Sequence, residues 1–240
     1  MRWCRFQNKD AASFGIIEGD EVVAVAGSPF AEYQRTDERH PLSSVQLLVP
    51  VIPPTFYAAG LNYREHVIES AAKRGEEPKF PPNADIGYRA NNALCANGEN
   101  IVIPKDASEV VQYEGELVAV IGKQCKHVSE AEALDYVFGY TIGNDVSERK
   151  WQHGDRTLWR GKNTDTFKPM GPWIETDVDL VQPIGLGTAF GVLGPVLDLG
   201  ARWPAVAAAG KLPEPVETHR SRLHAQRQAA DLAALGGDLR

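Results

Sequence analysis

The sequence has little of several features that mark large classes of protein. It contains three cysteines, Cys4, Cys95 and Cys125, with no CxxC pair and no second ligand at zinc-site spacing. No apolar run approaches the roughly 20 residues that a membrane helix needs, and the first residues, MRWCRFQNKD, lack the apolar stretch of a secretory signal. These absences argue against a disulfide framework, a zinc site and a membrane anchor, and we expect a cytoplasmic protein with reduced thiols.

Positive charge is also scarce. Lys and Arg number 25 against 32 Asp and Glu, the net charge is −7, and the basic residues are scattered along the chain. A protein of this charge has no basic surface for nucleic acid or for an anionic membrane. The phosphate-binding pattern GxxxxGK[ST] is absent, so the Gly161-Lys162 pair does not indicate a nucleotide site.

Residue patterns along the chain divide it into three parts. We expect a small β-rich unit at 1–50, a core at 51–180 and an alanine-rich tail at 181–240 with a helix at 214–235. The expected elements are a hairpin over 14–26, a connector over 31–46, strands at 55–59, 101–103, 114–121 and 138–143, helices at 62–73 and 129–136, and a long loop over 76–90. Gly75 is the expected end of the helix at 62–73.

The stretch VVQYEGELVAVIG places two carboxylates on one face of a predicted strand. Side chains alternate between faces, so Glu114 and Glu116 point to the same side as Val118 and Val120. Buried ionised carboxylates require a cation, a hydrogen-bond network or an open cavity. The alternative is a strand that begins at a solvated rim, with both glutamates in water.

Further polar residues have spacings that suit catalysis. Asp145 follows the β-like run FGYTIG, so a strand end would bring it beside the two glutamates, and three carboxylates without Cys or His would select a hard divalent ion such as Mg²⁺, Mn²⁺ or Ca²⁺. Singly, Asp145 also suits a turn or a helix cap. His66 and Glu69 lie three apart on a predicted helix, where a carboxylate can orient an imidazole that activates water. A surface His–Glu pair is the alternative.

Three residues carry the remaining candidate roles. Arg149 and Gln152 fall four and seven positions after Asp145, on one face of a helical turn, although solvent exposure is the usual state of such side chains. Lys162 lies in a predicted loop, RGKNTDTFKPMGPW. A lysine beside a metal would stabilise a developing enolate or alkoxide.

Four segments in order, GLNYREHVIE, YEGELVAVIGK, GYTIGNDVSERKWQ and RGKNTDTFKPMGPW, together resemble the fumarylacetoacetate hydrolase family. The resemblance covers about half the chain, from Phe56 to Asp179. It implies an α+β fold built on a mixed β-sandwich or barrel-like roll, usually a homodimer. It also implies C–C hydrolysis of a small 2-oxo or 1,3-diketo acid, with isomerisation, decarboxylation or hydration of 2-oxo dicarboxylates as the alternatives.

The resemblance assigns roles to the residues already named. Glu114, Glu116 and Asp145 would hold Mg²⁺, or else Mn²⁺ or Ca²⁺. His66 and Glu69 would activate water under a lid formed by residues 67–90, and Lys162, Arg149 and Gln152 would line the site and stabilise substrate charge. The partner that the resemblance implies is a small 2-oxo acid.

After Asp179 the sequence departs from the family's motifs. From residue 181 onward it becomes rich in alanine and poor in strand-forming residues, and the expected Asn-Gly turn and PGD…TGT-like stretch are missing. A replaced C-terminus, for example by a frameshift, is one hypothesis. It predicts either an active enzyme with an altered border to its site or a catalytically impaired remnant.

Overall fold

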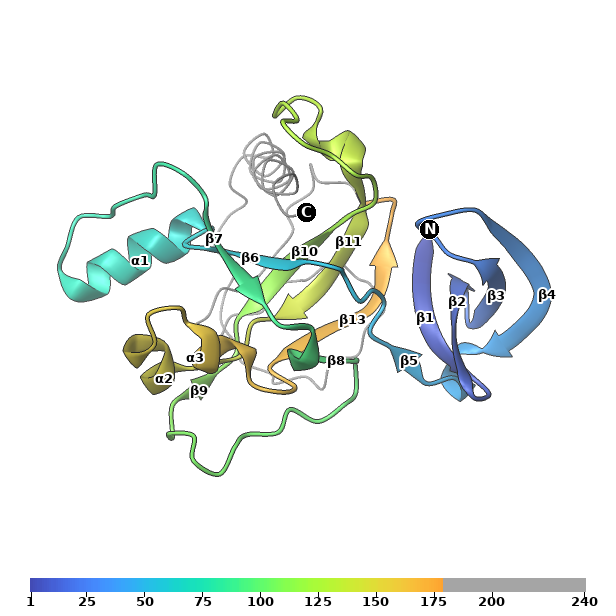
Figure 1. Ribbon diagram of the computed structural model, residues 1–240, viewed down its shortest axis with the longest axis horizontal. Helices are drawn as coiled ribbons and strands as arrows, with labels where there is room; N and C mark the ends of the chain where they lie inside the picture. The colour runs from blue at the N-terminus through green and yellow to red at the C-terminus, as the bar shows by residue number, and fades with distance from the viewer. Residues whose placement is uncertain (179–240) are drawn as a thin grey trace.

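The computed structural model describes residues 1–178 (Figure 1). Its first strands form an antiparallel meander of β1 (Arg2–Asn8), β2 (Ala11–Glu18), β3 (Glu21–Gly27) and β4 (Tyr33–Pro41). The hairpin predicted over 14–26 is β2 and β3, which pair from Phe14↔Val25 to Glu18↔Glu21. Gly19 has a φ of +60° in the turn between them, a conformation that glycine adopts without steric cost.

The prediction of a connector over 31–46 is wrong, because most of that segment is β4. This strand pairs with β3 at the end of the sheet order, and five of its nine residues are charged or polar side chains exposed to water. An edge strand buries little apolar surface, so its sequence lacks the hydrophobic alternation that identifies a strand.

The site is built on the other end of the same sheet. Its order is β10 (Gly115–Ile121), β11 (Val137–Asn144), β13 (Lys168–Glu175), β1, β2, β3 and β4, and the short strands β5 (Leu47–Leu48) and β8 (Leu94–Cys95) pair with β1 and β13. The expected strands at 114–121 and 138–143 therefore exist and are antiparallel neighbours.

The remaining elements flank these strands. They are β6 (Phe56–Gly60), α1 (Arg64–Arg74), β7 (Asp85–Arg89), β9 (Val111–Gln112), β12 (Ser147–Glu148), α2 (Arg149–Gly154), α3 (Trp159–Asn163) and the 3₁₀ turns Leu42–Ser44, Asn91–Ala93 and Ala133–Tyr136. In Figure 1, α1 projects on one side of the central strands, and α2 and α3 lie together below them. As predicted, α1 ends at Gly75, whose φ is +68° and whose N–H bonds to the last turn of the helix.

Three other element predictions need correction. Residues 101–103 form no strand, residues 129–136 form only the 3₁₀ turn Ala133–Tyr136, and the expected loop over 76–90 contains β7, which pairs with β6. Ser129 and Glu132 have the spacing that is typical of a helix start, and Ser129 Oγ hydrogen-bonds to Glu132 Oε2 at 2.5 Å, but no α-helix follows. The helix expected at 214–235 lies outside the described residues.

Apolar packing joins the first strands to β13. Cys4, Phe6, Ile17, Val22 and Ala24 form one buried cluster with Trp173, and Trp3, Ile16 and Val25 form another with Val120 and Ile174. Burial of such side chains contributes about 1.5–3 kcal/mol each. The boundary between two parts of the chain at residue 50 stays a prediction. Within residues 1–178, no helix has the length and apolarity to cross a membrane.

Candidate active site

The three candidate carboxylates come from adjacent strand ends. Glu116 lies in β10, Glu114 is the residue before the first residue of β10, and Asp145 is the residue after the last residue of β11. Backbone contacts fix this register: the N–H of Asp145 donates to the carbonyl of Glu114 at 2.8 Å, and the N–H of Glu114 donates to Asn144 Oδ1 at 3.0 Å. Side chains that are far apart in sequence therefore point into one region.

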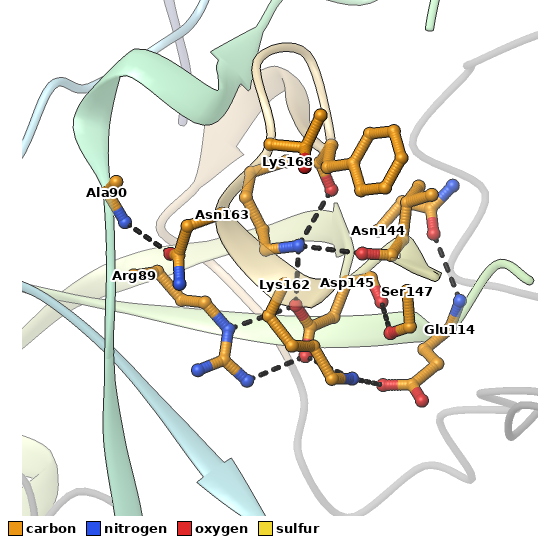
Figure 2. A network of polar contacts seen from close by, with 12 residues as sticks. Arg89, Ala90, Glu114, Asn144, Asp145, Ser147, Lys162, Asn163 and Lys168 are labelled. Atoms are coloured by element: carbon orange, nitrogen blue, oxygen red, sulfur yellow. Dashed lines mark hydrogen bonds and ion pairs between the residues drawn. The ribbon is translucent and has the colours of Figure 1, made fainter. Parts of the chain in front are cut away.

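Lys162 links two of these carboxylates. Its Nζ is 2.6 Å from Glu114 Oε2 and 2.9 Å from Asp145 Oδ2, with its side chain only 5% exposed (Figure 2). The lysine belongs to α3 rather than to a loop, which corrects the prediction. A Cβ on Gly161 would lie 2.7 Å from the backbone nitrogen of Gln152, so glycine permits α3 to pack closely on α2.

Two further cations contact Asp145. Arg89, the last residue of β7, forms a bidentate pair through Nε to Oδ1 at 3.0 Å and Nη2 to Oδ2 at 2.8 Å. Lys168, the first residue of β13, lies 2.8 Å from Oδ1 and also donates to the carbonyls of Val146 and Phe167. Figure 2 shows Arg89, Lys162 and Lys168 grouped around this carboxylate.

These contacts determine the charge states. Burial disfavours the Asp145 carboxylate, but Lys168, Arg89 and Lys162 outweigh burial and hold its pKa well below its usual range. Burial lowers the pKa of Lys168 to about 8, against the opposing charge of Asp145. Asp145 is therefore ionised at neutral pH.

Glu116 differs from the other two carboxylates. Burial and then the negative charge of Asp145 raise the pKa of Glu116 to about 8, although a hydrogen bond with Tyr63 and the charge of Lys162 lower it. Burial and the charge of Glu116 in turn raise the pKa of Tyr63 well above its usual value. Tyr63 also accepts a hydrogen bond from the N–H of Leu117 at 3.3 Å, so it ties the start of α1 to β10.

Helix α2 places Arg149 and Gln152 together, but it begins at Arg149, after β12, so the prediction that they share a helix face with Asp145 is wrong. Arg149 Nη1 is 2.6 Å from Glu114 Oε1 and 2.8 Å from Gln152 Oε1. The helix is held by Glu148, which is buried and accepts hydrogen bonds from the N–H of Trp151 and from Ser108. Both predicted residues are therefore positioned at the rim of the carboxylate cluster.

The helix α1 carries His66 and Glu69. His66 is half-buried and Glu69 is exposed. Neither His66 nor Glu69 is among the described residues that line the main cavity. The pairing of these two side chains therefore stays a prediction.

A cavity of about 830 Å³ opens beside the cluster. Its lining includes Arg89, Glu116, Asp145 and Lys168 of the cluster and the apolar side chains of Val51, Phe56, Val118 and Met170. Four other candidate residues are not among the described residues that line it: Glu114, Arg149, Gln152 and Lys162. Cavities with a few convergent polar groups in an apolar lining are typical small-molecule sites.

The carboxylates suit a hard divalent ion in donor type and in charge. All three offer oxygen, and the pKa of Glu116 is raised first by burial and then by the negative charge of Asp145, which a bound cation would offset. Within residues 1–178, however, no three His, Cys, Asp or Glu side chains stand close enough together to hold a metal ion without rearrangement. Lys162 is the cation that contacts two of the candidate ligands.

Three residues of this region were missed by sequence reasoning. Tyr63, Arg89 and Lys168 each contact or adjoin a carboxylate that is distant in sequence. Tyr63 and Lys168 lie inside the quoted motifs, so their position was a usable signal. Arg89 had none, because its segment had the composition of a loop.

The sequence matches two models of known protein families. The sequence model described as "Fumarylacetoacetate (FAA) hydrolase C-terminal" matches residues 55–197, more than half of the chain. The chain belongs to the fumarylacetoacetate hydrolase family. The match extends past Asp179, where the motifs were expected to end, and residues 1–50 match a second model, "Rv2993c-like, N-terminal".

Relatives support the α+β fold and membership of an enzyme family. Protein Rv2993c of Mycobacterium tuberculosis is 37% identical over 78% of this chain and 70% of its own length, and a Dictyostelium discoideum fumarylacetoacetate hydrolase domain-containing protein 2 homolog is 42% identical over 58% and 44%. This chain therefore spans less than half of the second relative.

Solved structures of relatives include an isomerase and a hydrolase. A 5-carboxymethyl-2-hydroxymuconate delta-isomerase from Mycobacterium smegmatis has a TM-score of 0.66 and 38% identity over 75% of this chain and 69% of its own. A maleylpyruvate hydrolase from Sphingobium, in complex with manganese(II) ion and pyruvate, has a TM-score of 0.55 and 26% identity over 77% and 70%. The family thus includes isomerases and hydrolases.

Proposed function

We propose that the protein is a divalent-metal-dependent enzyme that hydrolyses a C–C bond in a small 2-oxo or 1,3-diketo acid. The observation that carries the proposal is the convergence of Glu114 and Asp145 on the ammonium group of Lys162, with Glu116 beside them. Support also comes from the maleylpyruvate hydrolase relative, whose structure holds manganese(II) and pyruvate.

Glu114, Glu116 and Asp145 would hold the ion, with Mg²⁺ or Mn²⁺ as the expected metal. A bound divalent ion would polarise the 2-oxo carbonyl as a Lewis acid. Within residues 1–178, Lys162 Nζ donates to Glu114 and Asp145, so the third N–H of its ammonium group would donate to a substrate oxygen. That positive charge would stabilise the enolate left when the C–C bond breaks.

Arg149 and Gln152 would orient the substrate at the rim of the cluster. Arg149 is held by Glu114 and Gln152, so its guanidinium is pre-positioned for a second carboxylate of the substrate. His66, oriented by Glu69, would take a proton from the attacking water, with residues 67–90 excluding bulk water. We expect a homodimer, which light scattering coupled to gel filtration would test.

Isomerisation of a 2-oxo dicarboxylate is the second candidate. The isomerase relative is 38% identical, against 26% for the hydrolase. Isomerisation needs the same enolate stabilisation but no activated water, so it does not require His66 in the cavity.

Incubation of the purified chain with Mn²⁺ and a panel of acylpyruvates and unsaturated 2-oxo dicarboxylates would distinguish these candidates. Hydrolysis releases pyruvate and a second acid, whereas isomerisation changes absorbance without release of either. Loss of pyruvate release in His66→Ala supports hydrolysis. No turnover of any substrate, with Mn²⁺ bound, would contradict both enzymatic candidates and leave a metal-binding remnant.

A further inference from the structure

Asp145 has an unusually full set of partners for a candidate metal ligand. A carboxylate offers about four lone-pair sites. Arg89 and Lys168 occupy Oδ1 at 3.0 and 2.8 Å, while Arg89 and Lys162 occupy Oδ2 at 2.8 and 2.9 Å. A metal ion that binds Asp145 must therefore displace one of these cations.

The three cations differ in how firmly they are held. Lys162 reaches Glu114 as well as Asp145, so it lies between two candidate ligands. Lys168 instead directs its other two contacts away from the carboxylates, to the carbonyl oxygens of Val146 at 3.0 Å and Phe167 at 2.9 Å. With all three N–H groups used and 2% of the residue exposed, Lys168 is fixed in place.

We propose that Lys168 is a positioning residue of the metal site. Its ammonium group lies 2.8 Å from Oδ1 of Asp145 and so fixes the orientation of a carboxylate that would help to hold a divalent ion. Its charge also opposes the ion, so Lys168 weakens metal binding while fixing the ligand's orientation. The inference rests on the proposed metal site but concerns a residue to which that site assigned no role.

The expected effect is a gain in metal affinity when the charge is removed. Like charges a few Å apart, at an effective dielectric constant of about 20, repel by more than the equivalent of a tenfold change in binding. Lys168→Met removes the charge and the donors. Lys168→Gln removes the charge but keeps an NH₂ group that can donate to the carbonyls of Val146 or Phe167.

The test is a titration of the full chain with Mn²⁺ alone. Isothermal calorimetry measures the Mn²⁺ affinity, and thermal melting measures the stability of each variant. We expect both neutral variants to bind Mn²⁺ about tenfold more tightly than wild type, and Lys168→Arg to stay near wild type, because it keeps the charge. Lys105→Met is the matched control, since Lys105 is exposed and its loss changes the net charge equally.

A purely structural role for Lys168 would lower the melting temperature without raising Mn²⁺ affinity, and that result would overturn the proposal. Failure of both neutral variants to fold would also overturn it, because the lysine would then be required for folding rather than for tuning the site. Glu116→Ala separates the two proposals. If Glu116→Ala leaves Mn²⁺ binding intact, the proposed metal site is wrong. If Glu116→Ala weakens Mn²⁺ binding but the Lys168 variants bind Mn²⁺ with unchanged affinity, only the role of Lys168 is rejected.

Discussion

The two ends of the main sheet differ in whether their charged side chains are exposed or buried. Between β2, β3 and β4, Glu18 pairs with Arg35 and Arg39 at the surface, where these side chains are 41–49% exposed. Around Asp145 the paired side chains are 3–10% exposed. Exposed pairs contribute roughly 0–1 kcal/mol, and buried charges must overcome a desolvation cost that apolar side chains avoid.

This difference separates a part of the chain built for stability from a part that carries chemistry. The first strands bury Trp3, Phe6, Val22 and Val23 and keep charge outside. The β10–β11–β13 end buries the ionised cluster of Asp145, Lys162 and Lys168. Because buried ionisable clusters are weak evidence for stability, we attribute this one to function.

The largest effect that we expect is on stability, from a change at the apolar end. Phe6→Ala should lower the free energy of unfolding by about 3–5 kcal/mol, because it empties a fully buried ring position. Urea unfolding measures the loss, and Mn²⁺ affinity of the folded protein should not change. Phe80→Ala is the control, since Phe80 is 43% exposed. Equal losses of unfolding free energy in the two variants would contradict the assignment of stability to the buried residues of the first strands.

At the other end, Lys162→Met should act on turnover rather than on folding. We expect kcat/KM to fall about 10²- to 10³-fold, the usual cost of removing one group that stabilises transition-state charge. The urea midpoint should remain close to wild type, because Arg149 still pairs with Glu114 and both Arg89 and Lys168 with Asp145. Undiminished turnover would contradict the role of Lys162. Lys105→Met controls for net charge.

A smaller effect is expected at Glu148, which is buried for a structural reason. Glu148→Gln should cost about 1 kcal/mol at pH 7, because a helix cap for α2 is weakened. Burial raises the pKa of Glu148, but hydrogen bonds from Ser108 and Trp151 outweigh it and leave that pKa below the usual 4.5.

The lowered pKa of Glu148 sets the sign of its pH dependence. A carboxyl group whose folded pKa lies below its unfolded value stabilises the fold above the unfolded value, and this contribution disappears as pH falls through the folded pKa. The difference between wild type and Glu148→Gln should therefore narrow below pH 4.5. Urea unfolding at pH 7 and pH 4 measures it, with exposed Glu109→Gln as the control. A difference that widens in acid would exclude this role for the carboxylate.

The smallest effect is expected at the exposed pairs of the first strands. Glu18→Gln should leave the urea midpoint unchanged within error at moderate salt, because water and ions screen the contact with Arg35. Unfolding in low and high salt tests this. A shift as large as that of Glu148→Gln would show that surface pairs stabilise this sheet and would weaken the comparison.

Local patterns identified the elements whose stability is local or whose faces are clearly apolar. The β2–β3 hairpin, the β10 strand and the Gly75 end of α1 were all readable from turn residues and periodicity. The edge strand β4 and the short strand β7 were not, because each depends on a neighbouring strand for its hydrogen bonds. The 101–103 run has strand-like residues but lacks such a partner among residues 1–178.

The sequence by itself determined the family, the order of the four motifs and the alternation that sends Glu114 and Glu116 to one side. Only the tertiary structure decided which cations meet Asp145, since Arg89 is 56 positions away and its pairing follows from the packing of β7 beside α3. A carboxylate's partners depend on distances of a few Å in a region that excludes water. Sequence separation carries no information about such distances.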